Sequence, residues 1–304
     1  MRNYANLILV GIFMVHFTVL FGYFLKNFDE IAYAKIDLRM EKSLELNHKD
    51  KMREFQIKET GKAEEITVLM YHRIIDQKDL DEHHYHQNGD LHDTIVTLQD
   101  FEEQMQYLKE QGFTTLTMPE FRAYMNEELD VPSKSVLITF DDGFKDNYIN
   151  AYPVLKKHDF YATIFLITGN IDWKARDYNP SEAQYLSVQD INESLDVFSY
   201  YGHTHKFHQL TQNGESYLVA KKDKDVKDDI QSGFKMIGYS DAFAYPYGKY
   251  NESTIKILKE LNTELAFTTK DAMASPSDSK LEIPRRGIYP ETTLDVFSNL
   301  ITYE

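Results

Sequence analysis

The sequence contains no cysteine, which excludes disulfide bonds, thiolate metal ligands and a thiol nucleophile. Any bound metal ion must therefore be held by histidine and carboxylate side chains. Positive charge is also scarce, because 33 Lys and Arg residues stand against 49 Asp and Glu residues and give a formal net charge of −16. Nucleic acids and anionic lipids recruit proteins through basic patches, so neither is an expected partner. An acidic surface suits a neutral or cationic polymer instead.

The chain also has no internal repeat and no Gly-x-Ser-x-Gly turn, so catalysis through a covalent serine intermediate is not favoured. Hydrophobic residues make up 42% and charged residues 27%, the proportions of a folded globular protein. A length of 304 residues allows one large α/β domain with appendages, or two small domains.

A long apolar run occurs near the N-terminus, from Leu7 to Leu25, just after Arg2. Its length suits a membrane span better than the core of a signal peptide. Residues 1–34 are therefore predicted to be a signal anchor, with the rest of the chain outside the bacterial cell membrane. The small-x-small sequence Ala32-Tyr33-Ala34 leaves cleavage as a signal peptide open, in which case the protein is secreted or held at the cell surface. The charged residues 35–65 are predicted to form a solvated helical stalk or linker.

From Ile66 onward, strand-like and helix-like segments alternate, which predicts an α/β catalytic domain over residues 66–304 with a parallel sheet that is closed or nearly closed. The expected strands are Ile66–Tyr71, Thr114–Leu116, Ser135–Phe140, Ala162–Ile167, Val197–Tyr201, Phe243–Tyr245 and Leu265–Thr268. The expected helices are Leu98–Gln111, Pro119–Met125, Tyr152–Lys157 and Asn251–Leu261.

Two adjacent carboxylates follow the apolar strand Ser135–Phe140, in Asp141-Asp142-Gly143. The carboxyl edge of a parallel sheet is where catalytic groups collect. Neighbouring carboxylates raise each other's pKa unless a cation or hydrogen bonds intervene. The pair therefore indicates a metal site or a proton-transfer role, and an ordinary Asp-Gly turn is the alternative.

Three histidines lie within Gly202–His208, after another predicted strand. In a helix, His203 and His208 would point about 140° apart, whereas a strand end that bends into a loop can turn both toward one point. His203 with His205, or His205 with His208, could also meet on one face. Imidazoles with a carboxylate and an open position are typical of hydrolytic zinc sites. The spacing thus indicates a metal site and leaves the ligand pair open, with solvated loop histidines as the alternative.

Other segments are weaker candidates. His72 ends a predicted strand, where a lone histidine is most often structural, and Ala244–Gly248 contains a Pro-Tyr-Gly turn that could aim a backbone N–H into a site. Arg285 and Arg286 follow Pro284 and could pair with a carboxylate. The acidic insert Asp76–Asp93 carries His83, His84, His86 and His92, and it is predicted to be a mobile loop near the cleft rather than a second metal site.

Together these segments resemble the polysaccharide deacetylases, the family 4 carbohydrate esterases. Thr139–Gly143 resembles their first motif, His203-Thr204 with His208 the second, and Tyr245–Gly248 the third. The similarity covers about Ile66 to Tyr289. Many members carry an arginine in the third motif and a late Leu-x-x-His, and this chain has neither.

Two further segments, Val68–Ile74 and Ile283–Arg285, resemble the branch that deacetylates poly-β-1,6-N-acetyl-D-glucosamine in biofilm matrices. The resemblance implies a distorted (β/α) barrel and a surface hydrolase that acts on this polymer. Deacetylation of β-1,4 chains, as in peptidoglycan or chitin, is the alternative. A silent, membrane-anchored carbohydrate-binding protein is a further alternative, disfavoured by the complete set of motif residues.

The same resemblance implies a role for each matching residue. The divalent ion, Zn²⁺ first among the candidates, would be bound by three residues: Asp142, His203 and His208. The chemical step would use four others, with Asp141 as general base, Arg285 as its support, His72 as the acid that protonates the departing amine, and the backbone N–H of Tyr247 as oxyanion donor.

Overall fold

The computed structural model describes residues 13–24, 43–44, 46, 52–57, 61–239 and 241–301, and the chain divides into two compact units, residues 1–43 and 44–304. In the first unit, residues 13–24 form an exposed helix. The predicted apolar run extends beyond this helix, and the possible cleavage sequence at residues 32–34 lies outside the described residues. Across the described ranges, no helix combines the length and the apolar character that crossing a membrane requires.

Within the second unit, two described residues of the segment 35–65 contact the rest of the unit. Leu44 is buried, and its N–H donates to the carbonyl of Met236 at 2.8 Å. Arg53 donates from Nε and Nη2 to the two carboxylate oxygens of buried Glu120, both at 2.7 Å. At Leu44 and Arg53 the prediction of a solvated helical stalk is wrong, because apolar and ionic contacts hold these two residues to the second unit. For the rest of the segment it stays a prediction.

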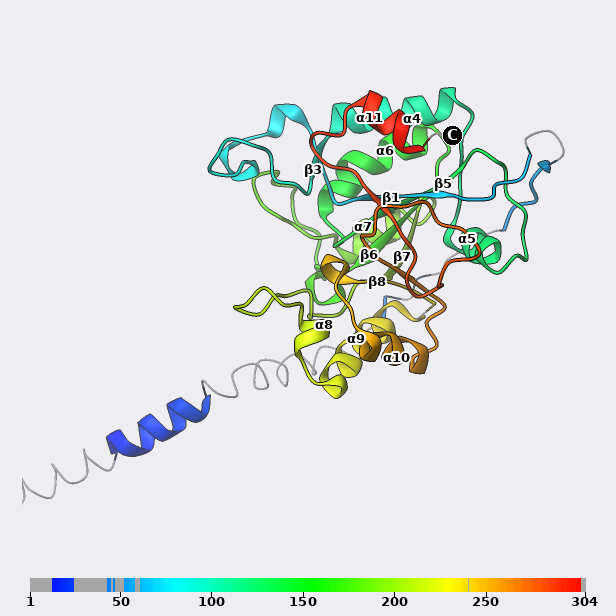
Figure 1. The fold of residues 1–304 in the computed structure, drawn as a ribbon. Coiled ribbons are helices and arrows are strands. Elements are labelled where there is room, and N and C mark those ends of the chain that lie inside the picture. The colour runs from blue at the N-terminus through cyan, green and yellow to red at the C-terminus, as the bar shows by residue number, and fades with distance from the viewer. Residues whose placement is uncertain are drawn as a thin grey trace, which may run out of the picture. The chain divides into compact units, whose positions relative to one another are not determined.

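A curled, all-parallel sheet forms the centre of the second unit (Figure 1). Its strands lie in the order β10-β1-β5-β6-β7-β8-β9, with β4 paired to the start of β5. Their bounds are β1 (Thr67–Tyr71), β4 (Thr114–Thr115), β5 (Ser135–Phe140), β6 (Ala162–Leu166), β7 (Phe198–Gly202), β8 (Ala242–Ala244), β9 (Leu265–Phe267) and β10 (Arg286–Gly287). All strands predicted from the sequence are present, with ends displaced by one residue at most. A separate parallel pair, β2 (Arg73–Ile75) and β3 (Ile95–Thr97), flanks the insert.

One short segment links the two edges of the curled sheet. Ile283 pairs with Phe267 of β9 in a parallel bridge, and β10, which begins three residues beyond it, pairs with Leu69 and Met70 of β1. Residues 283–287 therefore run from one edge of the sheet to the other. Arg285 lies in the middle of this link, which brings its side chain to the carboxyl ends of the strands.

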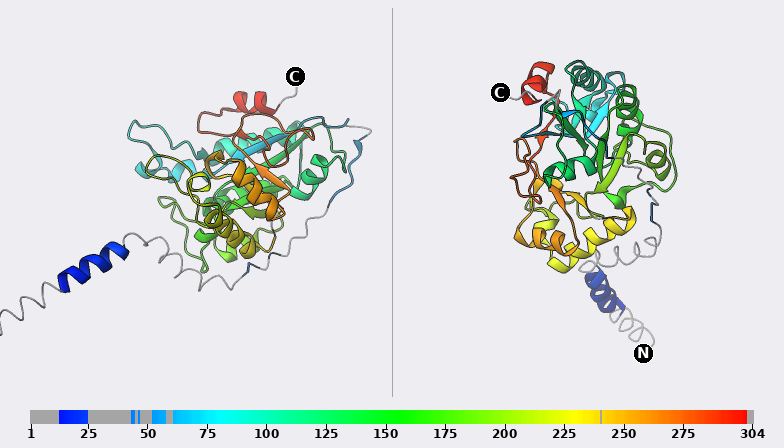
Figure 2. Two further views of the ribbon diagram at one scale, coloured as in Figure 1. Left: turned by 60° about the horizontal axis from the view of Figure 1, so that its bottom comes forward. Right: turned by 90° about the vertical axis from the view of Figure 1, so that its right-hand side faces the viewer.

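Helices cover the outside of the curled sheet (Figure 2). The four predicted helices are present as α4 (Leu98–Glu110), α5 (Met118–Met125), α6 (Tyr152–Lys157) and α10 (Glu252–Glu260). Four more were not predicted, namely α7 (Val188–Glu193), α8 (Tyr217–Ala220), α9 (Asp223–Ile237) and α11 (Leu294–Ile301). Helix α9 buries Val226, Ile230 and Phe234 at the spacing of an amphipathic helix and ends at Gly238, whose φ of +99° suits glycine.

The side chains of the strands belong to two separate buried clusters. Ile138 and Phe140 of β5 belong to one cluster with Phe101 of α4, whereas Leu137 belongs to the other with Phe267. This alternation follows from the two-residue period of a strand, which sends successive side chains to opposite faces. The sheet is thus buried on both faces, as parallel sheets are.

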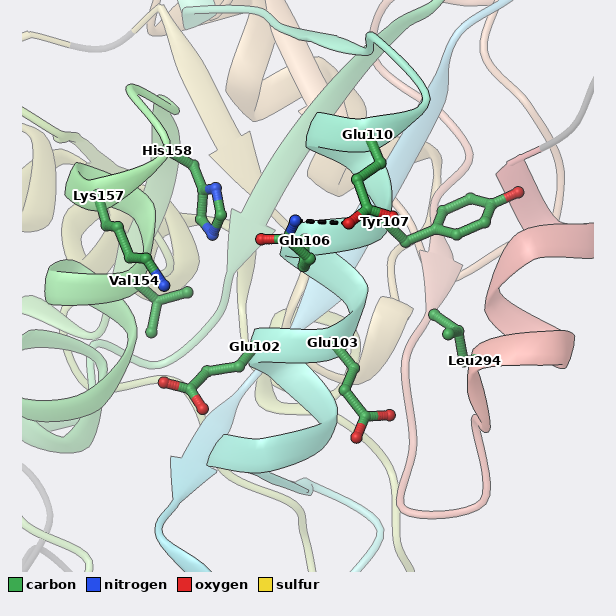
Figure 3. Close-up of a pocket in the computed structure, with 9 residues that line it drawn as sticks. All are labelled: Glu102, Glu103, Gln106, Tyr107, Glu110, Val154, Lys157, His158 and Leu294. Carbon is green, nitrogen blue, oxygen red and sulfur yellow. Dashed lines mark hydrogen bonds between the residues drawn. The ribbon is translucent and has the colours of Figure 1, made fainter.

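Helices α4, α6 and α11 also enclose a groove of about 370 Å³ (Figure 3). Its lining mixes charged and apolar side chains, with Glu102, Glu103 and Glu110 on α4, Lys157 and His158 at the end of α6, and Tyr107, Val154 and Leu294 between them. None of the site residues predicted from the sequence lines this groove.

Candidate active site

The Asp-Asp-Gly sequence forms a tight turn at the carboxyl end of β5. Asp142 and Gly143 both have left-handed backbone conformations, with φ of +72° and +78°. A Cβ added at Gly143 would lie 2.6 Å from Leu166 Cδ2, so this position accepts only glycine without rearrangement. The side chains of Asp141 and Asp142 are nonetheless buried, which an ordinary surface turn does not require. The segment is therefore both a turn and a buried carboxylate pair.

Two of the three loop histidines meet Asp142. The Nε2 atoms of His203 and His208 lie 3.5 Å and 3.2 Å from Asp142 Oδ1. The three residues offer ligand atoms within 4.8 Å of one another, and no other group of three or more such side chains in the described part of the chain does so. His205 points elsewhere, with its Nδ1 2.9 Å from Thr168 Oγ1. Of the ligand pairs left open by the sequence, the structure brings His203 and His208 together.

The protonation states in this group suit a divalent cation. Nδ1 of His203 lies 2.8 Å from the carbonyl oxygen of Ala244, which can only accept, so Nε2 keeps a lone pair toward Asp142. Burial lowers the pKa of His203 to about 3 and also lowers the pKa of His208, so both imidazoles are neutral at pH 7. Asp142 Oδ1 is buried without a hydrogen-bond partner. Two neutral imidazoles and an unsatisfied carboxylate oxygen therefore fit a cation as ligands.

Asp142 itself illustrates what the cation would change. Burial raises its pKa to about 6, with a further rise from the charge of Asp141 and an opposing effect of nearby His72. Burial disfavours the charged form of this carboxylate, and a positive ion beside it would stabilise that form.

Asp141 is held by a buried arginine. Nη1 and Nη2 of Arg285 donate to Asp141 Oδ1 and Oδ2, each at 2.7 Å, and the arginine is fully buried. Arg285 Nε donates to the carbonyl of Thr268 at 2.9 Å, which fixes the orientation of the guanidinium. Burial alone would raise the pKa of Asp141, but the charge and the hydrogen bonds of Arg285 outweigh it and hold the pKa well below its usual range. The two neighbouring carboxylates thus have pKa values shifted in opposite directions.

His72 lies beside both carboxylates, between β1 and β2. When protonated, its imidazole lowers the pKa of Asp141 and of Asp142, which places it within electrostatic reach of each. Its carbonyl oxygen accepts a hydrogen bond from Asn147 Nδ2 at 2.7 Å, so the segment just after the Asp-Asp-Gly turn holds the backbone of His72.

Tyr247 borders the site from the turn after β8. The turn Pro246–Gly248 is tight, and Tyr247 has a left-handed φ of +57°. The ring of Tyr247 lies against His208, with 4.5 Å between ring centroids, and the residue is 41% exposed. The structure therefore places an accessible aromatic ring beside the histidines. The oxyanion role of its backbone N–H stays a prediction.

The insert Asp76–Asp93 is more ordered than the sequence suggested. It contains two 3₁₀ turns, Gln77–Asp79 and Glu82–His84. His84 is buried, with Nδ1 3.0 Å from the N–H of Asp81 and Nε2 2.8 Å from the carbonyl of Pro180. The prediction of a mobile loop is corrected on this point, because these hydrogen bonds fasten the insert to the domain.

The comparisons with known proteins agree with this geometry. The polysaccharide deacetylase family model matches residues 128–266. The poly-β-1,6-N-acetyl-D-glucosamine N-deacetylase of Staphylococcus epidermidis (strain RP62A) is 31% identical over 227 residues, which cover 72% of this chain and 77% of that protein. The protein of the same name from Staphylococcus aureus (strain MSSA476) is 25% identical over 293 residues, covering 93% and 91%. This chain belongs to the polysaccharide deacetylase family.

Two solved structures resemble this polysaccharide deacetylase. The Streptococcus pyogenes deacetylase PplD in complex with acetate has a TM-score of 0.65 and 28% identity, over 79% of this chain and 99% of the other. IcaB from Ammonifex degensii has a TM-score of 0.65 and 24% identity over the same shares, which supports the fold alone. The chain is thus a deacetylase enzyme with the curled parallel sheet of that family.

Some residues of the deacetylase site were not predicted from the sequence. They do not belong to the group of Asp141, Asp142 and the histidines, but they hold the segments that carry these residues. Asp146 accepts from Arg73 Nε at 2.9 Å and from the N–H of Ile74 at 3.1 Å, which fixes the strand that follows His72. Residues 203–208 form the histidine loop, and Asp229 of α9 accepts hydrogen bonds from two of its backbone N–H groups, those of His205 and Lys206. Composition carries no signal for such partners, since their roles depend on contacts between distant segments.

Replacing Arg285 with glutamine should destabilise this deacetylase by about 3–5 kcal/mol at pH 7, because Asp141 is left buried and unpaired. The folded-state pKa of Asp141 is depressed, so the stabilisation by the pair is present above the unfolded pKa of about 3.9 and is lost as the pH falls through the folded value. In Arg285→Gln the pKa of Asp141 rises with burial, so the deficit should shrink on acidification. Urea unfolding at pH 7 and pH 5 measures both effects. The matched control is Arg286→Gln, at a half-buried position, and an equal loss in both variants would contradict the account.

His208→Ala should weaken zinc binding by more than about 100-fold, since losing a direct ligand costs more than losing an outer-shell partner. His205→Ala is the control three residues away and should change zinc affinity by less than about tenfold, because His205 bonds Thr168 instead. Isothermal titration of the full chain with zinc compares the two. The reverse order of losses would replace His208 by His205 in the ligand set.

Proposed function

We propose that this deacetylase removes N-acetyl groups from poly-β-1,6-N-acetyl-D-glucosamine in a reaction that depends on a divalent metal ion, with Zn²⁺ as the first candidate. The observation that carries the proposal is the trio Asp142, His203 and His208, of which the first two are buried and His208 is partly buried, directly beside an ionised Asp141. The relatives named for this polymer, up to 31% identical, support the choice of substrate.

Each residue of the site has a definite task in amide hydrolysis. A cation held by Asp142, His203 and His208 would polarise the acetamide carbonyl and make a neighbouring water more acidic. Asp141 accepts the proton of that water as its oxygen attacks the carbonyl carbon. Arg285 keeps Asp141 ionised until then and holds both carboxylate oxygens in place.

The later step needs an acid, because an amine is a poor leaving group. As the C–N bond breaks, His72 donates a proton to the departing nitrogen, and the products are acetate and a free amine on the sugar. The backbone N–H of Tyr247 is our candidate donor to the carbonyl oxygen, which becomes negatively charged during attack. The exposed ring of Tyr247 offers an apolar face for a sugar at the same place.

The role proposed for the whole chain is modification of the biofilm exopolysaccharide at the cell surface. The apolar run Leu7–Leu25 supports a location outside the bacterial cytoplasmic membrane, either through an anchor or after secretion. The net charge of −16 supports action on this polymer. Each deacetylation adds a cationic amine to the polymer, and an acidic protein surface attracts that product.

The substrate is tested by acetate release from the full chain on three substrates side by side: β-1,6-linked N-acetylglucosamine oligomers, β-1,4-linked oligomers and peptidoglycan. We expect the highest kcat/KM on the β-1,6 oligomers, loss of activity with a chelator and its return with Zn²⁺. A higher kcat/KM on a β-1,4 substrate would show that the proposed β-1,6 polymer is the wrong substrate. Full activity in the presence of the chelator would refute the metal dependence.

His72→Ala should lower kcat by about 10²–10⁴-fold, the usual contribution of a general acid, while zinc affinity stays within a few-fold. The control is His86→Ala in the exposed part of the insert, which should leave both values unchanged. An unaltered rate in the His72 variant, with the protein folded, would make His72 a structural residue.

A further inference from the structure

The loop that carries both metal-site histidines leaves the sheet after His203. His203 is held firmly, since its N–H donates to the carbonyl of Leu166 at 2.9 Å and its ring bonds Ala244. Thr204 then takes a left-handed φ of +71° and turns the chain out of the strand. His208 follows four residues later, so the position of its imidazole depends on what holds the intervening backbone.

A carboxylate on α9 holds that backbone. The N–H groups of His205 and Lys206 donate to Asp229 Oδ2 and Oδ1 at 2.9 Å and 2.8 Å. Asp229 is 2% exposed and lies in the middle of α9, a helix anchored by its own buried apolar residues. Hydrogen bonds to a charged acceptor are the strong ones, and here a single side chain fixes two successive peptide units.

The opposite side of the loop is held by the turn after β6. Thr168 N and Gly169 N donate to the carbonyls of Thr204 and His205 at 3.1 Å and 2.8 Å. A Cβ at Gly169 would lie 2.4 Å from the carbonyl oxygen of His205, so glycine permits this approach. On α9, a Cβ at Gly233 would lie 3.5 Å from His205 N. The histidine loop is therefore enclosed between α9 and this turn.

We propose that Asp229 is a positioning residue for the metal site, which fixes the loop so that His208 already faces Asp142 and His203 before a cation binds. This inference rests on the proposed metal-dependent function. Pre-ordering matters because a loop that had to become ordered on binding would subtract that cost from the metal affinity. Partners outside the first ligand layer commonly change metal affinity by about 10–100-fold.

The test is zinc titration of the full chain in the Asp229→Asn variant, with zinc alone as the probe. Asparagine keeps one acceptor oxygen but turns an NH₂ group toward the second peptide N–H. We expect the zinc Kd to rise by about 10–100-fold. At saturating zinc, kcat should return to within a few-fold of the wild-type value, because Asp229 does not touch the reacting atoms.

Two controls separate positioning from stability. Asp228→Asn changes the neighbouring exposed carboxylate on the same helix and should leave the zinc Kd unchanged. Glu120→Gln removes a buried carboxylate that accepts a hydrogen bond from the N–H of Thr117 at the start of α5, so it should lower the unfolding midpoint of the zinc-free chain without altering the zinc Kd. A zinc Kd for Asp229→Asn equal to that of the wild type would overturn the proposal.

The wild-type chain provides a measurement that does not depend on any variant folding. In zinc-free protein, the amide protons of His205 and Lys206 should exchange as slowly as those of β7. Exchange at the rate of an exposed loop would overturn the proposal. A wild-type chain that binds no zinc, yet shows slow exchange at both amides, would refute the proposed function while leaving the ordering of the loop by Asp229 in place.

Discussion

The contact between Arg285 and Asp141 is the interaction on which the rest of the site depends. A carboxylate buried at the end of β5 would normally become protonated, and the bidentate guanidinium reverses that tendency. The arginine can reach it because residues 283–287 link the two edges of the curled sheet. The segment that links the sheet edges therefore also sets the charge state of Asp141.

The adjacent Asp142 shows the opposite effect of the same burial. Arg285 bonds Asp141 and not Asp142, burial raises the pKa of Asp142 to about 6, and its Oδ1 faces two imidazole nitrogens without a hydrogen bond. Two neighbouring aspartates thus differ through their surroundings: an arginine holds Asp141 ionised, as the proposed base requires, and Asp142 keeps an unsatisfied buried oxygen, as the proposed ligand requires. The histidine loop completes this arrangement, and its backbone is held from two sides, by α9 and by the turn after β6.

Much of this arrangement could be predicted from the sequence. The strands along the chain, the position of Asp141 and Asp142 at a strand end, and the histidines after another strand follow from apolar runs that stop at polar residues. The order of the strands in the sheet was not predicted. The choice of His208 over His205 could not be made from spacing, because it depends on Thr204 turning the chain and on Thr168 occupying His205. Helix α9 was missed although Val226, Ile230 and Phe234 recur at helical spacing, since its many charged residues obscured the pattern. The site residue Asp229 was missed with it.

The central claim is that one carboxylate and two imidazoles converge on a single cation. X-ray absorption at the zinc edge of the zinc-loaded chain tests it most directly. We expect two imidazole nitrogens at about 2.0–2.1 Å and carboxylate or water oxygen at about 2.0–2.2 Å around one zinc ion. A shell with one imidazole or none, or a chain that takes up no zinc, would contradict it.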